Sequence, residues 1–162
     1  MTHEPNEPTA TMQNPTINEH VIESLYNEGL LLADEARAAF DMRAAHDVDA
    51  MPASVRLALS VEGLRTTTRL MNVLAWLLNQ RAYLSGEMSE NQLRRHGTLG
   101  KDRPSDPSQL RLLEPATRAL IVDSERLYAR VARLDSDWRA DRVAAAPVQV
   151  LRGRIAQAFA AH

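Results

Sequence analysis

The segment TTTRLMNVLAWLLNQRA, residues Thr66–Ala82, decides the class of fold. Between residues 70 and 78 it carries one polar side chain, Asn72, and its apolar groups point in every helical direction. A surface helix buries a single stripe, so this helix needs neighbours on more than one side. It is too short to supply the ~20 apolar residues that span a bilayer, and Arg69 and Arg81 flank its apolar part. We therefore expect the central helix of an all-α bundle, with no membrane insertion.

The composition supports a single helical domain. The 162 residues include only six glycines and eight prolines, and 44% are apolar, which is ordinary for a globular chain. No cysteine is present, so disulfides and thiolate metal ligands are excluded. The first residues also lack the cationic and apolar regions of a signal peptide. We therefore expect a cytoplasmic protein.

The middle helix is expected from Pro52 or Ala53 to Ser85, where Gly86 provides a stop. Two apolar stripes run along it. One has heptad spacing and comprises Leu57, Val61, Leu64, Thr68, Met71, Ala75, Leu78 and Ala82. The other comprises Leu59, Gly63, Thr67, Leu70, Leu74, Leu77 and Leu84. Because a helix with two stripes faces two neighbours, the sequence predicts a three-helix bundle.

Two further long helices are expected to flank the middle one. Residues 18–45 place small and medium side chains at heptad spacing, namely Ile22, Leu25, Gly29, Leu32, Ala36 and Ala39. In residues 108–141 the seam comprises Leu113, Leu120, Leu127 and Leu134, with Thr117, Ser124, Val131 and Trp138 as partner positions. Pro115 is tolerated in the first turn of this helix. We expect the three helices to be antiparallel and to form one domain, residues 17–145.

The remaining segments are expected to be irregular. Residues 1–16 are rich in Pro, Thr, Asn and Glu, so a disordered N-terminus is predicted. Between the second and third long helices, Ser89 and Gln92 fit a capping box for one short helical turn. Residues 97–107 then show no periodicity, and we expect a flexible connector there.

The C-terminus is expected to separate from the bundle. The residues Ala144–Pro147 are predicted to end regular structure, because proline breaks a helix. Residues 146–162 then form a tail with a short amphipathic helix. Its apolar stripe, a candidate for docking into a partner groove, comprises Leu151, Ile155 and Phe159.

Val73 and Trp76 lie outside both stripes of the middle helix. An exposed patch centred on a tryptophan is more often an interface than an accident. We therefore expect a homodimer through Val73 and Trp76. The alternative is cover within the chain, by residues 86–107 or by the C-terminal tail.

Cations provide the other candidates for partner docking. Arg81 falls on the second stripe and is interpreted either as an ion pair with an acidic residue of the first helix or as an anchor for a partner. Four more cations lie in the connector, namely Arg94, Arg95, Lys101 and Arg103. They are interpreted either as solvated loop charge or as a docking site for an acidic partner or for phosphates.

No pattern of catalytic, cofactor-binding or metal-binding residues stands out. The sequence His46–Asp49 offers metal-ligand types, but it has no third partner at a useful spacing and is interpreted as a solvated helix end. The sequence Gly97–Lys101 lacks the spacing of a phosphate-binding loop. We therefore expect no enzyme, no cofactor and no metal.

A DNA-binding regulator is the strongest rival function. The short helix of the connector followed by a long helix suggests a helix-turn-helix, but the two are separated by an irregular stretch with two prolines, Pro104 and Pro107. A pI near 6.2 also disfavours a phosphate binder. A purely structural dimeric scaffold is the other alternative.

Two segments resemble a known family. The sequence LRTTTRLMNVLAWLLNQRAYLSGEMS, residues Leu64–Ser89, resembles the signature segment of the RcdA-like family, regulators of CtrA degradation in alphaproteobacteria. The sequence SLYNEGLLLADEARAAFD, residues Ser24–Asp41, is similar to the first helix of that family. The resemblance is close over these two segments and rests on length and architecture elsewhere.

This resemblance implies a dimeric three-helix bundle that acts as a non-enzymatic adaptor. Such adaptors help to deliver cell-cycle regulators to the ClpXP protease, together with other adaptors, and they are recruited to a cell pole. The resemblance also implies a role for the C-terminal tail, roughly residues 146–162, in contacting cargo or a partner.

Overall fold

The computed structural model describes the backbone of residues 15–41 and 50–160, and the side chains of residues 18–41 and 50–143 and of Leu151. These residues form five helices and no strand. The helices are α1 (Pro15–Phe40), α2 (Ala53–Leu84), α3 (Glu90–His96), α4 (Pro107–Leu110) and α5 (Pro115–Ala160). The all-α prediction is confirmed. Disorder was predicted for residues 1–16, but α1 already begins at Pro15, so residues 15 and 16 are helical. Residues 1–14 and the interpretation of His46–Asp49 lie outside the described residues.

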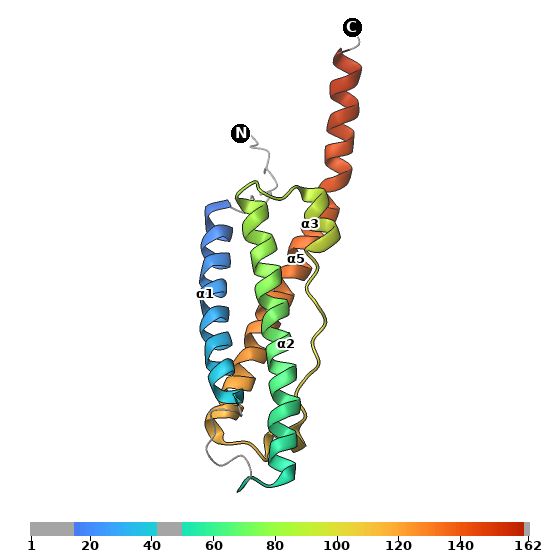
Figure 1. Ribbon diagram of the computed structural model, residues 1–162. Coiled ribbons are helices and arrows are strands. Elements are labelled where there is room, and N and C mark those ends of the chain that lie inside the picture. The colour runs from blue at the N-terminus through green and yellow to red at the C-terminus, as the bar shows by residue number, and fades with distance from the viewer. Residues whose placement is uncertain (1–14, 42–49, 161–162) are drawn as a thin grey trace, which may run out of the picture.

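The long helices α1, α2 and α5 pack along one another as a helical bundle, and α3 and α4 lie in the connector between α2 and α5 (Figure 1). α1 runs antiparallel to α2, as predicted: Arg81 near the end of α2 contacts Glu23 near the start of α1. α2 and α5 run parallel, however, because Arg69 contacts Ser124 and Trp76 contacts Asp135. The prediction of three antiparallel helices is therefore wrong for α2 and α5. The connector runs back along the bundle, so α5 begins at the end of the bundle where α2 also begins.

The buried seams of α1 and α5 match the predicted heptads. In α1 they comprise Ile22, Leu25, Gly29, Leu32 and Ala36, whereas Ala39 is exposed. In α5 and the turn before it, the buried members of the predicted seam are Leu113, Leu120, Ser124, Leu127 and Val131, whereas Thr117, Leu134 and Trp138 are half-buried. Ile121 and Asp135 are also buried, although neither belongs to the predicted seam. Gly29 permits a close approach of α1 to α2, because a Cβ there would lie 3.0 Å from Leu74 Cδ2. Local periodicity therefore identified the face that each of these helices buries.

α2 buries one of its two predicted stripes in part, through Gly63, Leu70 and Leu77, and leaves the other one exposed. The residues that the chain buries are Ala58, Glu62, Gly63, Thr66, Arg69, Leu70, Val73, Trp76, Leu77 and Gln80. The predicted heptad stripe instead faces outward, with its large members exposed: Leu57 59%, Leu64 71%, Met71 65% and Leu78 46%. The reason is that α5 and the connector both cover the mixed apolar and polar face, which leaves the more apolar heptad uncovered.

The connector packs on the bundle rather than forming a separate loop. Ser89 and Gln92 make the predicted capping box at the start of α3. Residues 97–106 are not helical and run back along α2 and α5 to reach α4 (Figure 1). Leu99 is 9% exposed and joins the core that contains Trp76 and Leu127. The prediction of a flexible connector is therefore corrected to a packed one.

α5 does not stop at Ala144–Pro147 as predicted. It begins at Pro115, consistent with a proline in the first turn, and continues through Pro147 to Ala160, projecting beyond the rest of the bundle (Figure 1). A proline within a helix removes one backbone hydrogen bond, but the alanines before it are the strongest helix formers. The boundary placed at residue 146 therefore falls inside one continuous helix.

Candidate functional site

Trp76 and Val73 are buried inside the chain, which corrects their assignment to an exposed dimer patch. Val73 is 0% exposed and Trp76 1%. The indole ring of Trp76 packs against Trp138 with a centroid separation of 5.7 Å, and the connector contributes Leu99 to the same core. The alternative of cover within the chain is the one that the structure contains, supplied by α5 and the connector.

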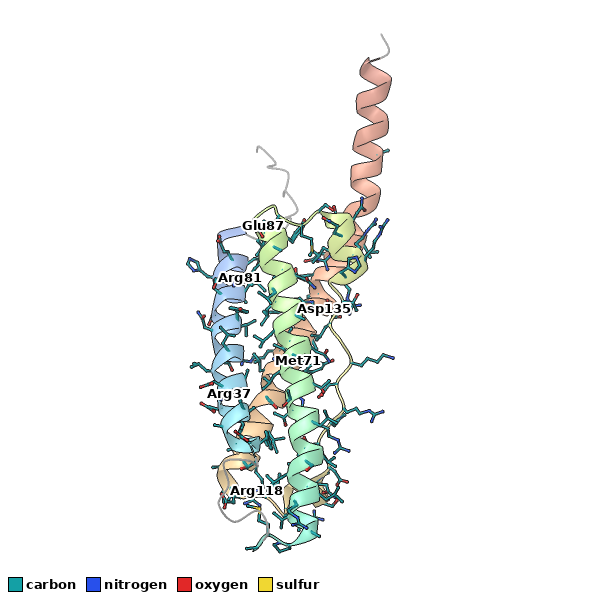
Figure 2. All side chains as sticks on the ribbon, in the orientation of Figure 1. Arg37, Met71, Arg81, Glu87, Arg118 and Asp135 are labelled. Carbon is teal, nitrogen blue, oxygen red and sulfur yellow. The ribbon has the colours of Figure 1, made fainter. Side chains whose placement is uncertain are left out.

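Arg81 forms the intrachain ion pair that was one of its two interpretations. Its Nε lies 2.7 Å from Glu23 Oε1 of α1, and its guanidinium stacks 4.7 Å above the ring of Tyr26. Figure 2 shows Arg81 at the end of α2 that lies beside α1. Both charged side chains are about two-fifths exposed, so the pair contributes at most about 1 kcal/mol to stability. Arg81 thus serves first to join α1 to α2.

The heptad stripe of α2 forms a row of exposed apolar side chains on the described surface, and we call it the α2 seam. Its large members are Leu57, Leu64, Met71 and Leu78, and its smaller members between them are Val61, Thr68, Ala75 and Ala82. Met71 is labelled midway along the seam in Figure 2. Steps of four and three residues alternate along the whole row, which is the spacing of a coiled-coil contact. The periodicity of the sequence predicts this row of residues but places it in the interior, whereas its large members are exposed.

A hollow of about 360 Å³ lies beside the α2 seam, between α1 and α2. Its lining is mostly apolar and includes Phe40, Leu70, Met71 and Leu74, with Arg37 on the rim. Because Met71 belongs to both features, the hollow extends the apolar surface of the seam toward α1.

A buried polar cluster surrounds Arg69, which is fully buried between α2, α5 and the connector. Its three guanidinium nitrogens donate hydrogen bonds to Asp102 Oδ2 at 2.9 Å, Ser124 Oγ at 2.8 Å, the Arg103 carbonyl at 3.1 Å and Glu125 Oε1 at 3.3 Å. A buried guanidinium is tolerated when it is paired with carboxylates and each of its nitrogens donates a hydrogen bond, as here. From the sequence alone, Arg69 was interpreted only as a flank of the apolar run. The signal that was missed is its position next to Leu70 and three residues after Thr66, which are both buried.

Glu62 holds the end of the connector that leads into α4. Its Oε1 accepts hydrogen bonds from Arg65 at 2.6 Å and from the Asp106 backbone N–H at 3.2 Å. Asp106 in turn caps α4, and the hydrogen bond from the Ser108 hydroxyl lowers the pKa of the Asp106 carboxyl below its usual value. The two carboxylates therefore fix where the connector ends.

The four connector cations remain on the surface. They are Arg94 and Arg95 on α3, and Lys101 and Arg103 on the segment that follows, and all are exposed. The acid among them, Asp102, points inward to Arg69 and does not neutralise them. The structure thus leaves all four cations exposed on α3 and on the segment that follows it.

Of the three tail residues, the structure describes the side chain of Leu151. Leu151 is 58% exposed on the projecting part of α5, and the side chains of Ile155 and Phe159 lie outside the described ones. Among the described residues, none of the His, Asp and Glu side chains gather in threes at a metal-binding distance. The described helices also include none that is long and apolar enough to cross a membrane.

No curated protein and no solved structure matches the chain significantly. A family model described as "Protein of unknown function (DUF1465)" matches residues 13–159. The matched range includes every described helix apart from the last residue of α5. The chain therefore belongs to the DUF1465 family.

Proposed function

We propose that the protein is an interaction module without catalysis of its own, a three-helix bundle of α1, α2 and α5 that forms a homodimer through the α2 seam. The observation that carries this proposal is the exposure of Leu57, Leu64, Met71 and Leu78 at heptad spacing. Exposure of such a row of large apolar side chains to water is unfavourable in free energy. A second helix with the same spacing can pack against the row and exclude water from it.

The α2 seam is complementary to itself when two copies pair antiparallel. Large and small members then alternate across the contact: Leu57 faces Ala82 of the second copy, Leu64 faces Ala75, Met71 faces Thr68, and Leu78 faces Val61. Each large side chain thus meets a smaller one, which allows the helices to approach closely. Full burial of a large apolar side chain contributes about 1.5–3 kcal/mol, and these side chains still have 46–71% of their surface exposed. Burying the rest of it on four such side chains in each copy therefore offsets part of the cost of association.

Charge does not oppose this pairing. The two cations that flank the seam, Arg65 and Arg81, are ion-paired within their own chain to Glu62 and Glu23. Like charges facing each other across the contact would otherwise weaken it.

We further propose that the dimer acts as an adaptor in regulated proteolysis. The support is the resemblance of residues 64–89 and 24–41 to RcdA-like proteins, together with two candidate docking features. One is the cationic outer side of the connector, for an acidic partner. The other is the projecting end of α5, with Leu151, Ile155 and Phe159. Two weak contacts on one adaptor raise the effective concentration of a substrate near a protease such as ClpXP. Recruitment of the adaptor to a cell pole would follow from binding to such partners.

Dimerisation is tested with the variant Leu64→Glu/Met71→Glu, whose carboxylates would meet an apolar surface in the dimer. We expect the wild type to be dimeric by light scattering and the variant to be monomeric with unchanged helicity. The matched control is Leu31→Glu/Leu112→Glu, which changes two exposed leucines outside the seam and should remain dimeric. A wild type that stays monomeric at high micromolar concentration would overturn the proposal.

The adaptor role is tested by affinity capture from an alphaproteobacterial lysate. The full-length chain is compared with a variant that ends at Ala146, which lacks most of the projecting helix. Recovery of the ClpX unfoldase by the full-length chain, lost on truncation, is the expected result. Recovery of the protein alone would reject the adaptor role and leave the dimeric scaffold.

A further inference from the structure

We infer that the surface of α2 and α5 under the connector is a binding groove for an extended polypeptide, and that residues 97–106 occupy it from within the same chain. We call this surface the connector groove. The inference does not depend on the α2 seam or on dimerisation. The partner that fits the groove is an extended protein segment with the pattern Leu-Gly-x-Asp.

The first observation is that the connector groove contacts main-chain atoms. Four side chains donate to backbone carbonyls: Asn79 to His96 at 3.1 Å, Tyr128 to Gly100 at 2.8 Å, Asn72 to Lys101 at 3.4 Å and Arg69 to Arg103 at 3.1 Å. Two carboxylates accept from backbone N–H groups: Glu125 from Ser105 at 2.9 Å and Glu62 from Asp106 at 3.2 Å. Every peptide presents these carbonyl and amide groups, so recognition of this kind is not restricted to the connector.

The second observation is that few connector side chains enter the groove. Leu99 is buried in the core, and Asp102 pairs with Arg69 at 2.9 Å, whereas Lys101 between them is exposed. At Gly100 a Cβ would lie 2.6 Å from Oδ1 of Asn72, so any larger residue must displace a side chain that holds the main chain. The groove therefore selects a leucine, then a glycine, then an acid two positions later.

The two halves of the connector are held with different strength. A buried guanidinium and two carboxylates hold residues 102–106, while neutral hydrogen bonds and Leu99 hold residues 96–101. Hydrogen bonds to charged groups are the stronger kind. A competing peptide therefore displaces the half that contains Leu99 and Gly100 first, and residues 102–106 follow when its own acid replaces Asp102 on Arg69. Residues 97–106 are held at both ends, by α3 and by α4. Their effective concentration at the groove is therefore high, and they keep it occupied in the isolated protein.

The test uses the full chain with its connector weakened and its groove intact, in the variant Leu99→Ser/Gly100→Ala. The probe is a fluorescein-labelled peptide of residues 95–106, and binding is measured by fluorescence anisotropy. The control peptide carries the same two changes as the variant and has the same charge. We expect the natural peptide to bind the variant at least about tenfold more tightly than it binds the wild type, since the wild-type groove is occupied.

The control peptide should bind the variant at least about tenfold more weakly than the natural one, because it lacks the buried leucine. Adding Tyr128→Phe to the variant should weaken the natural peptide, while Tyr83→Phe should not. Equal binding of both peptides would mean a general attraction of a cationic peptide, and it would overturn the inference. If the double variant fails to fold, Leu99→Ala alone weakens the connector more mildly and is judged by the same comparisons.

Discussion

The indole N–H of Trp76 donates a 2.9 Å hydrogen bond to Oδ1 of Asp135, and both residues are about 1% exposed. The other carboxylate oxygen, Oδ2, lies 2.7 Å from the Arg139 guanidinium at the surface of α5. This arrangement pairs a donor on α2 with an acceptor on α5 in the middle of an apolar core. It therefore fixes the axial position of α5 relative to α2 in their parallel contact.

Removing the indole donor should destabilise the bundle. Trp76→Phe leaves the buried Asp135 oxygen without its partner, and we expect a loss of about 1–3 kcal/mol in the free energy of unfolding. Urea denaturation followed by circular dichroism measures it. Trp138→Phe, which changes the other ring of the pair, is the control and should cost less. Equal losses would show that ring packing, not the hydrogen bond, dominates at Trp76.

Arg69 should be the most costly polar residue to replace. Arg69→Met leaves Asp102 and Glu125 without their cation, and breaking a buried pair in this way costs about 3–5 kcal/mol. The matched control is Arg126→Met, whose ion pair with Asp123 is exposed and should change stability by less than about 1 kcal/mol. Thermal unfolding of the two variants gives the comparison. Similar melting temperatures would contradict a structural role for the cluster.

The antiparallel arrangement of the α2 seam makes a prediction that other arrangements do not. Ala75→Leu should weaken the dimer by overpacking and Leu64→Ala by leaving a gap, each by about 1–3 kcal/mol or more. Combined in one chain, the two changes exchange large for small across the same contact and should restore most of the affinity. Sedimentation equilibrium measures the dissociation constants. Additive losses in the double variant would rule out this register.

The Tyr128 hydroxyl should ionise at a higher pH than that of an ordinary tyrosine. Burial raises the pKa of its hydroxyl above the usual value near 10, and the protonated form donates to the Gly100 carbonyl. Because the folded pKa is the higher one, this stabilisation is complete below about pH 10 and is lost as the pH rises through the folded value. Phenolate absorbance of the wild type minus that of Tyr128→Phe isolates this group. A midpoint at or below that of the remaining tyrosines would contradict the assignment.

The bundle should not need the projecting end of α5. A variant that ends at Val143 keeps every contact described for the core, so we expect its melting temperature to stay within about 2 °C of the full-length value. Differential scanning calorimetry is the measurement. A large drop in melting temperature would mean that residues beyond 143 pack on the bundle.

The all-α class and the buried faces of α1 and α5 could be predicted, because they depend on periodicity within one helix. Ile22, Leu25 and Leu32 mark the inner face of α1 as clearly in the sequence as in the structure. The end of α2 was likewise predicted at Gly86, whose φ of 79° favours glycine after a helix. Such features require no knowledge of what lies next to the helix.

The buried face of α2 could be predicted only in part, through Gly63, Leu70 and Leu77, because the rest of it depends on where the chain goes afterwards. Leu64 and Met71 fit a core seam better than Thr66 and Arg69 do, and only the parallel placement of α5 reverses the choice. The same holds for Trp76, whose partner Asp135 is 59 residues away. Leu99 had no periodic neighbours to mark it as a core residue.

The parallel course of α2 and α5 determines the outline of the proposed dimer. Helical rise is 1.5 Å per residue, so the part of α5 beyond Val143 is about 25 Å long. When two α2 helices pair antiparallel, the two projecting ends of α5 point in opposite directions. The particle is then elongated, and the ends of its two α5 helices lie at its far tips. One short ligand can touch one tip only, whereas engaging both at once requires a ligand longer than the bundle itself.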